Sequence, residues 1–143
     1  MNHYIPTIFC RLATVLVIGM VSLDSSAQST FSVDYNWSLV DRCSSASPEL
    51  RITGIPAGTN SLEITLVDHD APNYSHGGGI IATVNEIKEL TVEKGSLKNY
   101  RGPCPPNFSS FGHDYSFVVK ARSSTGELAS ATKLQNFSAS KVK

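Results

Sequence analysis

The sequence predicts an all-β fold, a sandwich or a pair of packed sheets. About six short runs have the polar–apolar alternation or the apolar content of strands, and no long run repeats its apolar positions at the helical period. Glycine and proline cluster between these runs, as in Gly54–Gly58, where they favour turns. A chain with this pattern buries one sheet against another and contains little helix.

The predicted strands follow one another along the chain without an internal repeat. Residues 31–38 alternate aromatic or aliphatic side chains with polar ones, which is typical of a half-buried strand. The other predicted strands are 50–53, 62–66, 80–84, 115–120 and 128–134. Residues 85–90 are compatible with one helical turn but are too few to decide. Residues 100–106 contain three prolines and are expected to be stiff and extended, because proline fixes φ and lacks a backbone donor.

The first 27 residues have the composition of a secretory signal peptide. Arg11 precedes an apolar run, 12–23, that is too short to span a bilayer, and the small residues Ser25, Ser26 and Ala27 follow it. We therefore expect cleavage after Ala27, with a signal peptide at 1–27 and one β domain at 28–143. No later run is apolar enough to span a membrane. The mature protein is expected to be secreted or periplasmic and not membrane-spanning.

Charge and cysteine content narrow the choice of partners and compartment. The formal net charge is zero, so nothing global attracts nucleic acid, and no nucleic-acid partner is expected. Cys43 and Cys104 remain after cleavage, and two cysteines in an oxidising compartment most simply form a disulfide. The alternatives are two free buried thiols or, less favoured because no histidine neighbours either residue in sequence, a catalytic cysteine.

The segment 68–79 concentrates polar chemistry where a predicted strand ends. Asp68, His69, Asp70 and His76 lie within nine positions, and three glycines follow. Carboxylates and imidazoles beside bare backbone suit an anion site or a metal site. The same residues also fit a polar turn that merely ends a strand.

Three stretches, taken together, resemble the phosphatidylethanolamine-binding protein family, which includes the Raf kinase inhibitor protein and small bacterial secreted relatives. The stretches are Ser47–Leu50 with Gly54–Leu62, then Asp68–Pro72 with His76, and finally Tyr100–Pro106 leading to Gly112–Tyr115. The similarity spans most of residues 31–135. It implies a large antiparallel sheet packed on a smaller one, and a binding protein that is not an enzyme. We expect no cofactor and no metal ion.

The resemblance also implies a small surface pocket for an anion such as the phosphate of a phospholipid head group. Carried onto this chain, its lining is Asp68, Asp70, Pro72, His76, Gly102, Pro103, His113 and Tyr115. The two pocket histidines are expected to donate hydrogen bonds to the anion, and the glycines at 77–79 and 102 to let backbone N–H groups approach it. Asp68 is expected to orient and charge one of these histidines, or to accept a bond from an ammonium group. Tyr115 either adds a hydroxyl donor or belongs to the core.

The chain departs from the family pattern at three places. His69 stands where the family usually has proline, and Asp114 where arginine often follows the second histidine. No pattern of a C-terminal helix follows the last predicted strand. We expect His69 to be exposed, since it has no counterpart in the family.

Three functions remain open at this point. The first is an exported binding protein for small anions or phospholipid head groups such as phosphatidylethanolamine. The second is a protein-interaction module that inhibits a protease or binds a surface protein. The third is a metal-dependent hydrolase that uses Asp68, Asp70, His76 and His113. It is less favoured because no tight metal motif such as His-Glu-x-x-His is present. A serine hydrolase is weaker still, because no Gly-x-Ser-x-Gly elbow occurs.

Overall fold

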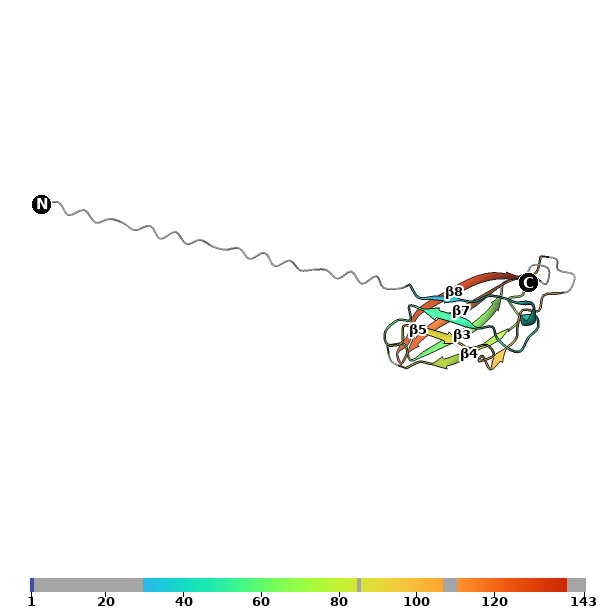
Figure 1. The fold of residues 1–143 in the computed structure, drawn as a ribbon, viewed down its shortest axis with the longest axis horizontal. Coiled ribbons are helices and arrows are strands. Elements are labelled where there is room, and N and C mark those ends of the chain that lie inside the picture. Colours follow the sequence, from blue (N-terminus) through green and yellow to red (C-terminus); the bar gives the residue numbers. More distant parts are fainter. Residues whose placement is uncertain (2–29, 85, 107–110, 139–143) are drawn as a thin grey trace.

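The chain folds as two packed antiparallel sheets (Figure 1). The computed structural model describes Met1 and residues 30–84, 86–106 and 111–138. The smaller sheet has the order β1-β2-β5, with bounds Ser32–Asp34, Leu50–Thr53 and Glu89–Val92. The larger has the order β6-β4-β3-β7-β8, with bounds Asn99–Tyr100, Gly77–Ala82, Ser61–Asp68, His113–Ser123 and Gly126–Phe137. The predicted all-β fold with little helix is confirmed.

The described residues contain one 3-10 turn, Leu39–Asp41, and no helix long and apolar enough to cross a membrane. The helical turn that residues 85–90 allow does not form at their C-terminal end, because Glu89 and Leu90 begin β5. Leu90 and Val92 alternate with polar neighbours there and pair with β2. This alternation is typical of a strand, and the segment forms one. The predicted signal peptide and its cleavage position lie outside the described residues.

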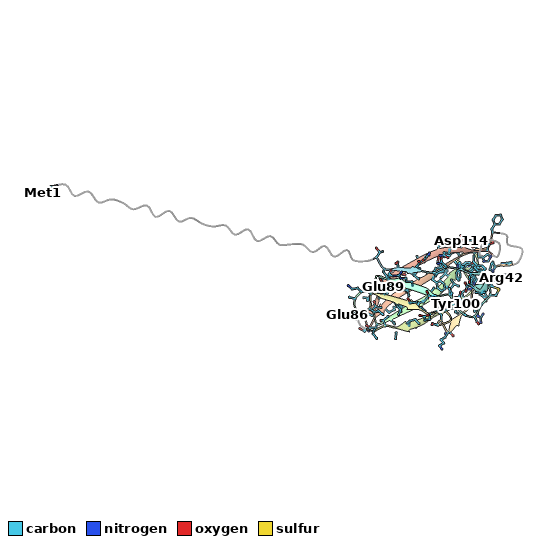
Figure 2. The ribbon with its side chains drawn as sticks, viewed as in Figure 1. Met1, Arg42, Glu86, Glu89, Tyr100 and Asp114 are labelled. Atoms are coloured by element: carbon cyan, nitrogen blue, oxygen red, sulfur yellow. A yellow bond between two sulfur atoms is a disulfide. The ribbon has the colours of Figure 1, made fainter. Side chains whose placement is uncertain are left out.

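The core lies between the sheets and follows from the alternation along each strand. Figure 2 shows the described side chains on the two sheets. On β3, Leu62, Ile64 and Leu66 are buried and alternate with half-buried residues. The other buried hydrophobic strand residues are Val33, Leu50, Ile52, Val92, Tyr100, Tyr115, Phe117, Val119, Ala121, Ala131 and Phe137. A buried aliphatic or aromatic side chain stabilises the fold by roughly 1.5–3 kcal/mol.

Both central strands carry a polar residue where their inward-facing series reaches one end of the sandwich. The β3 series that runs through Leu66 ends at Asp68, and the β7 series that contains Tyr115 begins at His113. Asp68 is the register partner of Tyr115. Asp68 and His113 are therefore diagonal neighbours on the inner face of the sheet. A carboxylate and an imidazole therefore occupy inward-facing positions at the end of the core, where the other inward-facing residues are apolar.

A disulfide joins Cys43 to Cys104, as predicted, with their Cα atoms 4.6 Å apart. Two backbone hydrogen bonds flank it. The N–H of Cys43 donates to the carbonyl of Pro103 over 2.8 Å, and the N–H of Gly102 donates to the carbonyl of Ser44 over 2.7 Å. This clip holds the extended segment after β6 against the loop that follows the 3-10 turn.

Candidate functional site

Asp68 is a buried carboxylate at the centre of the polar cluster. It is 3% exposed, and its Oδ1 accepts the backbone N–H groups of Asp70 and Ala71 over 2.9 and 3.0 Å. Burial alone would raise the pKa of this carboxyl group, but the hydrogen bonds from His113 and from the two backbone groups outweigh it. The pKa of Asp68 is therefore held below its ordinary value, and the group is ionised at neutral pH.

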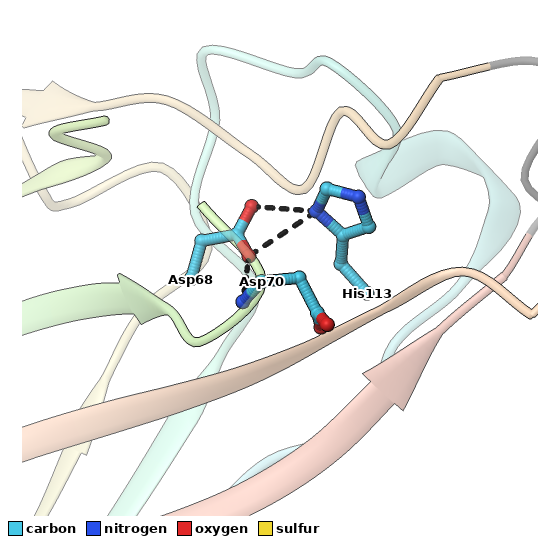
Figure 3. Close-up of side chains that lie close together, drawn as sticks. All are labelled: Asp68, Asp70 and His113. Carbon is cyan, nitrogen blue, oxygen red and sulfur yellow. Dashed lines mark hydrogen bonds and ion pairs between the residues drawn. The ribbon is translucent and has the colours of Figure 1, made fainter. Parts of the chain in front are cut away.

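His113 is locked to Asp68 through its Nδ1, which lies 2.9 Å from Oδ2 and 3.2 Å from Oδ1 (Figure 3). Because an ionised carboxylate can only accept, Nδ1 carries the proton and donates it. The His113 side chain is 18% exposed, so this ring connects the buried carboxylate to the surface. The expectation that Asp68 orients one histidine agrees with this geometry.

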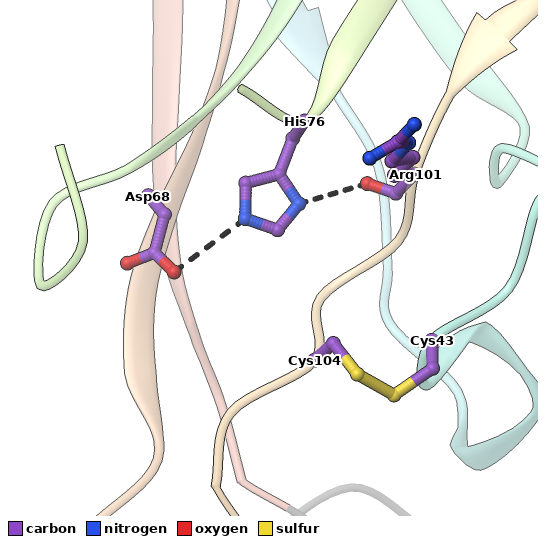
Figure 4. Close-up of a disulfide and its surroundings, with 5 residues drawn as sticks. All are labelled: Cys43, Asp68, His76, Arg101 and Cys104. Carbon is purple, nitrogen blue, oxygen red and sulfur yellow. Dashed lines mark hydrogen bonds and ion pairs between the residues drawn. A yellow bond between two sulfur atoms is a disulfide. The ribbon is translucent and has the colours of Figure 1, made fainter. Parts of the chain in front are cut away.

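His76 contacts Asp68 from the other side and is almost completely buried (2% exposed). Its Nδ1 donates to the carbonyl of Arg101 over 2.9 Å (Figure 4). Its Nε2 lies 3.5 Å from Oδ2 of Asp68 and finds no hydrogen-bond partner in the described part of the chain. Tyr74 and Tyr115 pack edge-on against its ring, with centroids 4.7 and 5.3 Å away.

Tyr115 belongs to the core, which is one of the two roles considered for it. Its ring is fully buried in the core, and its hydroxyl has Asp68 as an electrostatic neighbour. Burial first, and then the Asp68 carboxylate, raise the pKa of this phenol above its ordinary value, so the hydroxyl keeps its proton. Among the described residues, none lies in hydrogen-bonding geometry with that hydroxyl.

The structure does not gather all the predicted lining residues around Asp68. Asp70 stays close to Asp68 and His113, but it is exposed, and its Oδ2 accepts the N–H of Asp114 over 2.7 Å. Pro72 is exposed on the turn that follows. Gly102 and Pro103 are buried in the disulfide clip, where they pair with Ser44 and Cys43.

The glycines have another role than the predicted one. A Cβ at Gly77 would meet the carbonyl oxygen of Asn99, and one at Gly78 would meet that of Ile64. These positions are bare because neighbouring strands approach closely. The Gly102 N–H already donates to Ser44, so it is not free for a ligand.

His69 is exposed, as expected, and lies apart from the cluster. It follows Asp68 directly, so the alternation of the strand turns it to the opposite face. There its Nε2 lies 2.8 Å from Oγ of Ser116. It takes no part in the contacts of Asp68.

Backbone groups complete the site, and no sequence pattern identifies them. The carbonyl of Arg101 fixes the tautomer of His76, and the N–H of Ala71 helps to hold Asp68. Every residue carries such groups, so residue type does not reveal which of them will face a site. Tyr74, which packs on His76, has an aromatic side chain but no distinguishing sequence pattern.

Three side chains could hold a metal ion. Asp68, Asp70 and His113 each offer one ligand atom, and these atoms all lie within 4.8 Å of one another. Carboxylate and imidazole ligands suit zinc or a similar ion. If the ligand atom of His113 is its Nδ1, binding would require that nitrogen to release the proton it gives to Asp68.

The family model described as phosphatidylethanolamine-binding protein matches residues 26–143, a range that includes every strand of both sheets. Among curated proteins, no sequence matches the chain.

Proposed function

Because the chain belongs to the phosphatidylethanolamine-binding protein family, we propose that it is an exported binding protein, not an enzyme, for small phosphate-bearing ligands. The ligand class includes phospholipid head groups such as that of phosphatidylethanolamine. The binding site is the cluster of Asp68, His76, His113 and Tyr115 at the end of the sandwich. His113 is its contact with solvent.

The observation that carries this proposal is the hydrogen bond between Asp68 and His113. The bond uses Nδ1 of the ring, so Nε2 is the nitrogen that remains for a ligand. When the ring is protonated, its Nε2–H can donate a charge-assisted hydrogen bond to an anion. Asp68 thus fixes the orientation of a partly exposed imidazole at the edge of the site.

An ammonium group on the ligand would find a second carboxylate. Asp68 already accepts three hydrogen bonds, whereas the side chain of Asp70 is exposed. Its ligand oxygen lies within 4.8 Å of the ligand atoms of both Asp68 and His113. Asp70 is therefore the carboxylate that the ammonium of an ethanolamine head group reaches from solvent.

Export is supported by two independent features. The first 27 residues have the composition of a signal peptide. The Cys43–Cys104 disulfide agrees with an oxidising compartment, where such bonds form and persist.

The test is a calorimetric or NMR titration of the oxidised protein with phosphoethanolamine. We expect saturable binding that is lost in His113→Ala. His69→Ala, which removes the exposed imidazole of the opposite face, is the matched control and should bind as before. Saturable zinc binding without any response to phosphoethanolamine would overturn the proposal and favour a metal site at Asp68, Asp70 and His113.

A further inference from the structure

We propose that this protein forms a dimer in which β8 of one copy pairs antiparallel with β8 of a second copy, so that the two larger sheets become one continuous sheet. The inference concerns the margin of the sheet and does not depend on the proposed ligand function. It follows from a row of backbone N–H and C=O groups on β8 that β7 does not pair.

β8 is the outermost strand at one margin of the larger sheet (Figure 1). It has 12 residues, and its strand partner in the described sheet is β7. The outermost strand at the opposite margin, β6, has 2 residues. A long outermost strand offers a row of unpaired backbone groups on which another strand can form, whereas a very short one does not. The margin at β8 is therefore the one suited to pairing.

The hydrogen bonds of β7 show which groups of β8 are free. The carbonyl of Asp114 accepts the N–H of His69, and that of Arg122 accepts the N–H of Asn60, so the even-numbered residues of β7 direct their backbone groups to the side of β3. The odd-numbered residues of β7 therefore bond to β8, and their register partners are the odd-numbered residues 129–137. The residues of β8 that direct their N–H and C=O groups away from the sheet are Ser130, Thr132, Leu134 and Asn136. All four are exposed, and no backbone hydrogen bond between described residues reaches these groups.

The free margin of β8 lacks the common devices that prevent strand addition. Residues 127–137 contain neither proline nor glycine. The register shift in the β7–β8 pair falls before residue 129, so the row of free groups is regular. Proline, bulges and charged side chains are what usually protect an outermost strand. In this row they are absent.

Lys133 is the one charged residue between Leu128 and Phe137, and its charge is already paired. It lies on the inner face of β8, where its Nζ forms an ion pair with Asp34 and donates to the carbonyl of Tyr35 over 3.3 Å. An inward-pointing lysine protects a margin when a second strand would bury its charge without a partner. Lys133 has this partner within its own copy, so it does not exclude a second strand.

The charges favour a second copy as the occupant. The four residues of the free row are uncharged, and the whole chain has a formal net charge of zero, so two copies do not repel each other. A two-fold axis makes the pair antiparallel, and the same row then serves as both partners. With the axis at Thr132, Ser130 faces Leu134 of the second copy, and about six backbone hydrogen bonds form. Lys133 then lies opposite Ala131 of the second copy, so like charges do not meet directly.

The first test is the molar mass of the oxidised protein, measured by light scattering over a series of concentrations. We expect the mass to rise to twice that of one chain. Leu134→Lys places a charge inside the paired row of each copy, and this variant should keep the mass of one chain. Ile80→Lys, the same exchange on β4, is the matched control and should dimerise as the wild type does. These side chains are 56% and 72% exposed, so neither exchange removes core packing.

The second test is amide hydrogen exchange of the wild type. In a monomer, the amides of Ala131 and Lys133 are protected by β7, whereas those of Ser130, Thr132 and Leu134 exchange rapidly. We expect these three amides to become protected as the concentration rises and to stay unprotected in Leu134→Lys. If that variant does not fold, the wild-type exchange pattern decides alone.

Three results would overturn the inference. The first is the mass of one chain at every concentration, together with rapid exchange of the three amides. The second is the mass of one chain with these amides protected, which would mean that another segment of the same chain covers β8. The third is a dimer that Ile80→Lys abolishes and Leu134→Lys does not, which would place the interface at β4.

Discussion

His113 on β7 donates from Nδ1 to the carboxylate of Asp68 on β3, over 2.9 Å, at the point where the apolar core of the sandwich ends. Both residues continue inward-facing series that are otherwise apolar. The cluster is therefore built into the sheet itself, and its geometry depends on the register of two strands. A site of this kind is rigid, and its residues contribute to stability as well as to binding.

Asp68→Ala is expected to lower the free energy of unfolding by about 2–3 kcal/mol, because it leaves Nδ1 of His113 and two backbone N–H groups without their acceptor. Urea denaturation measures this loss. Asp114→Ala removes a carboxylate that accepts one side-chain bond, from Asn136, and should cost less than about 1 kcal/mol. Equal losses in the two variants would show that Asp68 does not hold the cluster together.

Removal of the Cys43–Cys104 bridge is expected to lower stability by about 4 kcal/mol, because the bridge closes a long loop in the unfolded chain. The double variant Cys43→Ala/Cys104→Ala, compared with the oxidised protein in urea, measures the effect. An unchanged midpoint would mean that the backbone hydrogen bonds between the loop at 43–44 and the segment at 102–103 hold the clip without the disulfide.

The sequence predicted most of the fold because it depends on local alternation. The alternating apolar residues Leu62, Ile64 and Leu66 predict β3. If this alternation continues, the side chain of Asp68 faces the core and that of His69 faces outward. Alternation alone does not predict the diagonal contact with His113, because the contact depends on a register between strands that are far apart in sequence. The family resemblance placed both residues in one pocket, but it did not show which histidine Asp68 would hold. Bare backbone at Gly77 suggested ligand access, whereas the glycine is required by close packing of β6.

Alkaline pH is expected to unfold the protein and to ionise its buried tyrosines together. Burial is the main cause that raises the pKa of Tyr35, Tyr100 and Tyr115 above the ordinary value. The fold therefore favours the neutral phenols, and this stabilisation is complete below the unfolded pKa of about 10 and is lost as the pH rises beyond it. Tyrosinate absorbance and circular dichroism, recorded on the same samples, should change together for these three residues. Their ionisation in a protein with native circular dichroism would contradict the prediction.

Gly77→Ala is expected to damage both stability and ligand binding, whereas Gly58→Ala should affect stability alone. Both glycines have a left-handed backbone, with φ of 66° and 80°, so alanine costs each about 1–2 kcal/mol. A Cβ at Gly58 would meet open space, but at Gly77 it would collide with the backbone carbonyl of Asn99 on β6. Relief of that collision must move β6 or β4. His76 directly precedes β4, and its Nδ1 donates to the carbonyl of Arg101, which directly follows β6. Urea denaturation should show a larger loss for Gly77→Ala, and phosphoethanolamine titration should show weaker binding in that variant only. Equal losses of stability with unchanged binding would mean that β6 moves without disturbing His76.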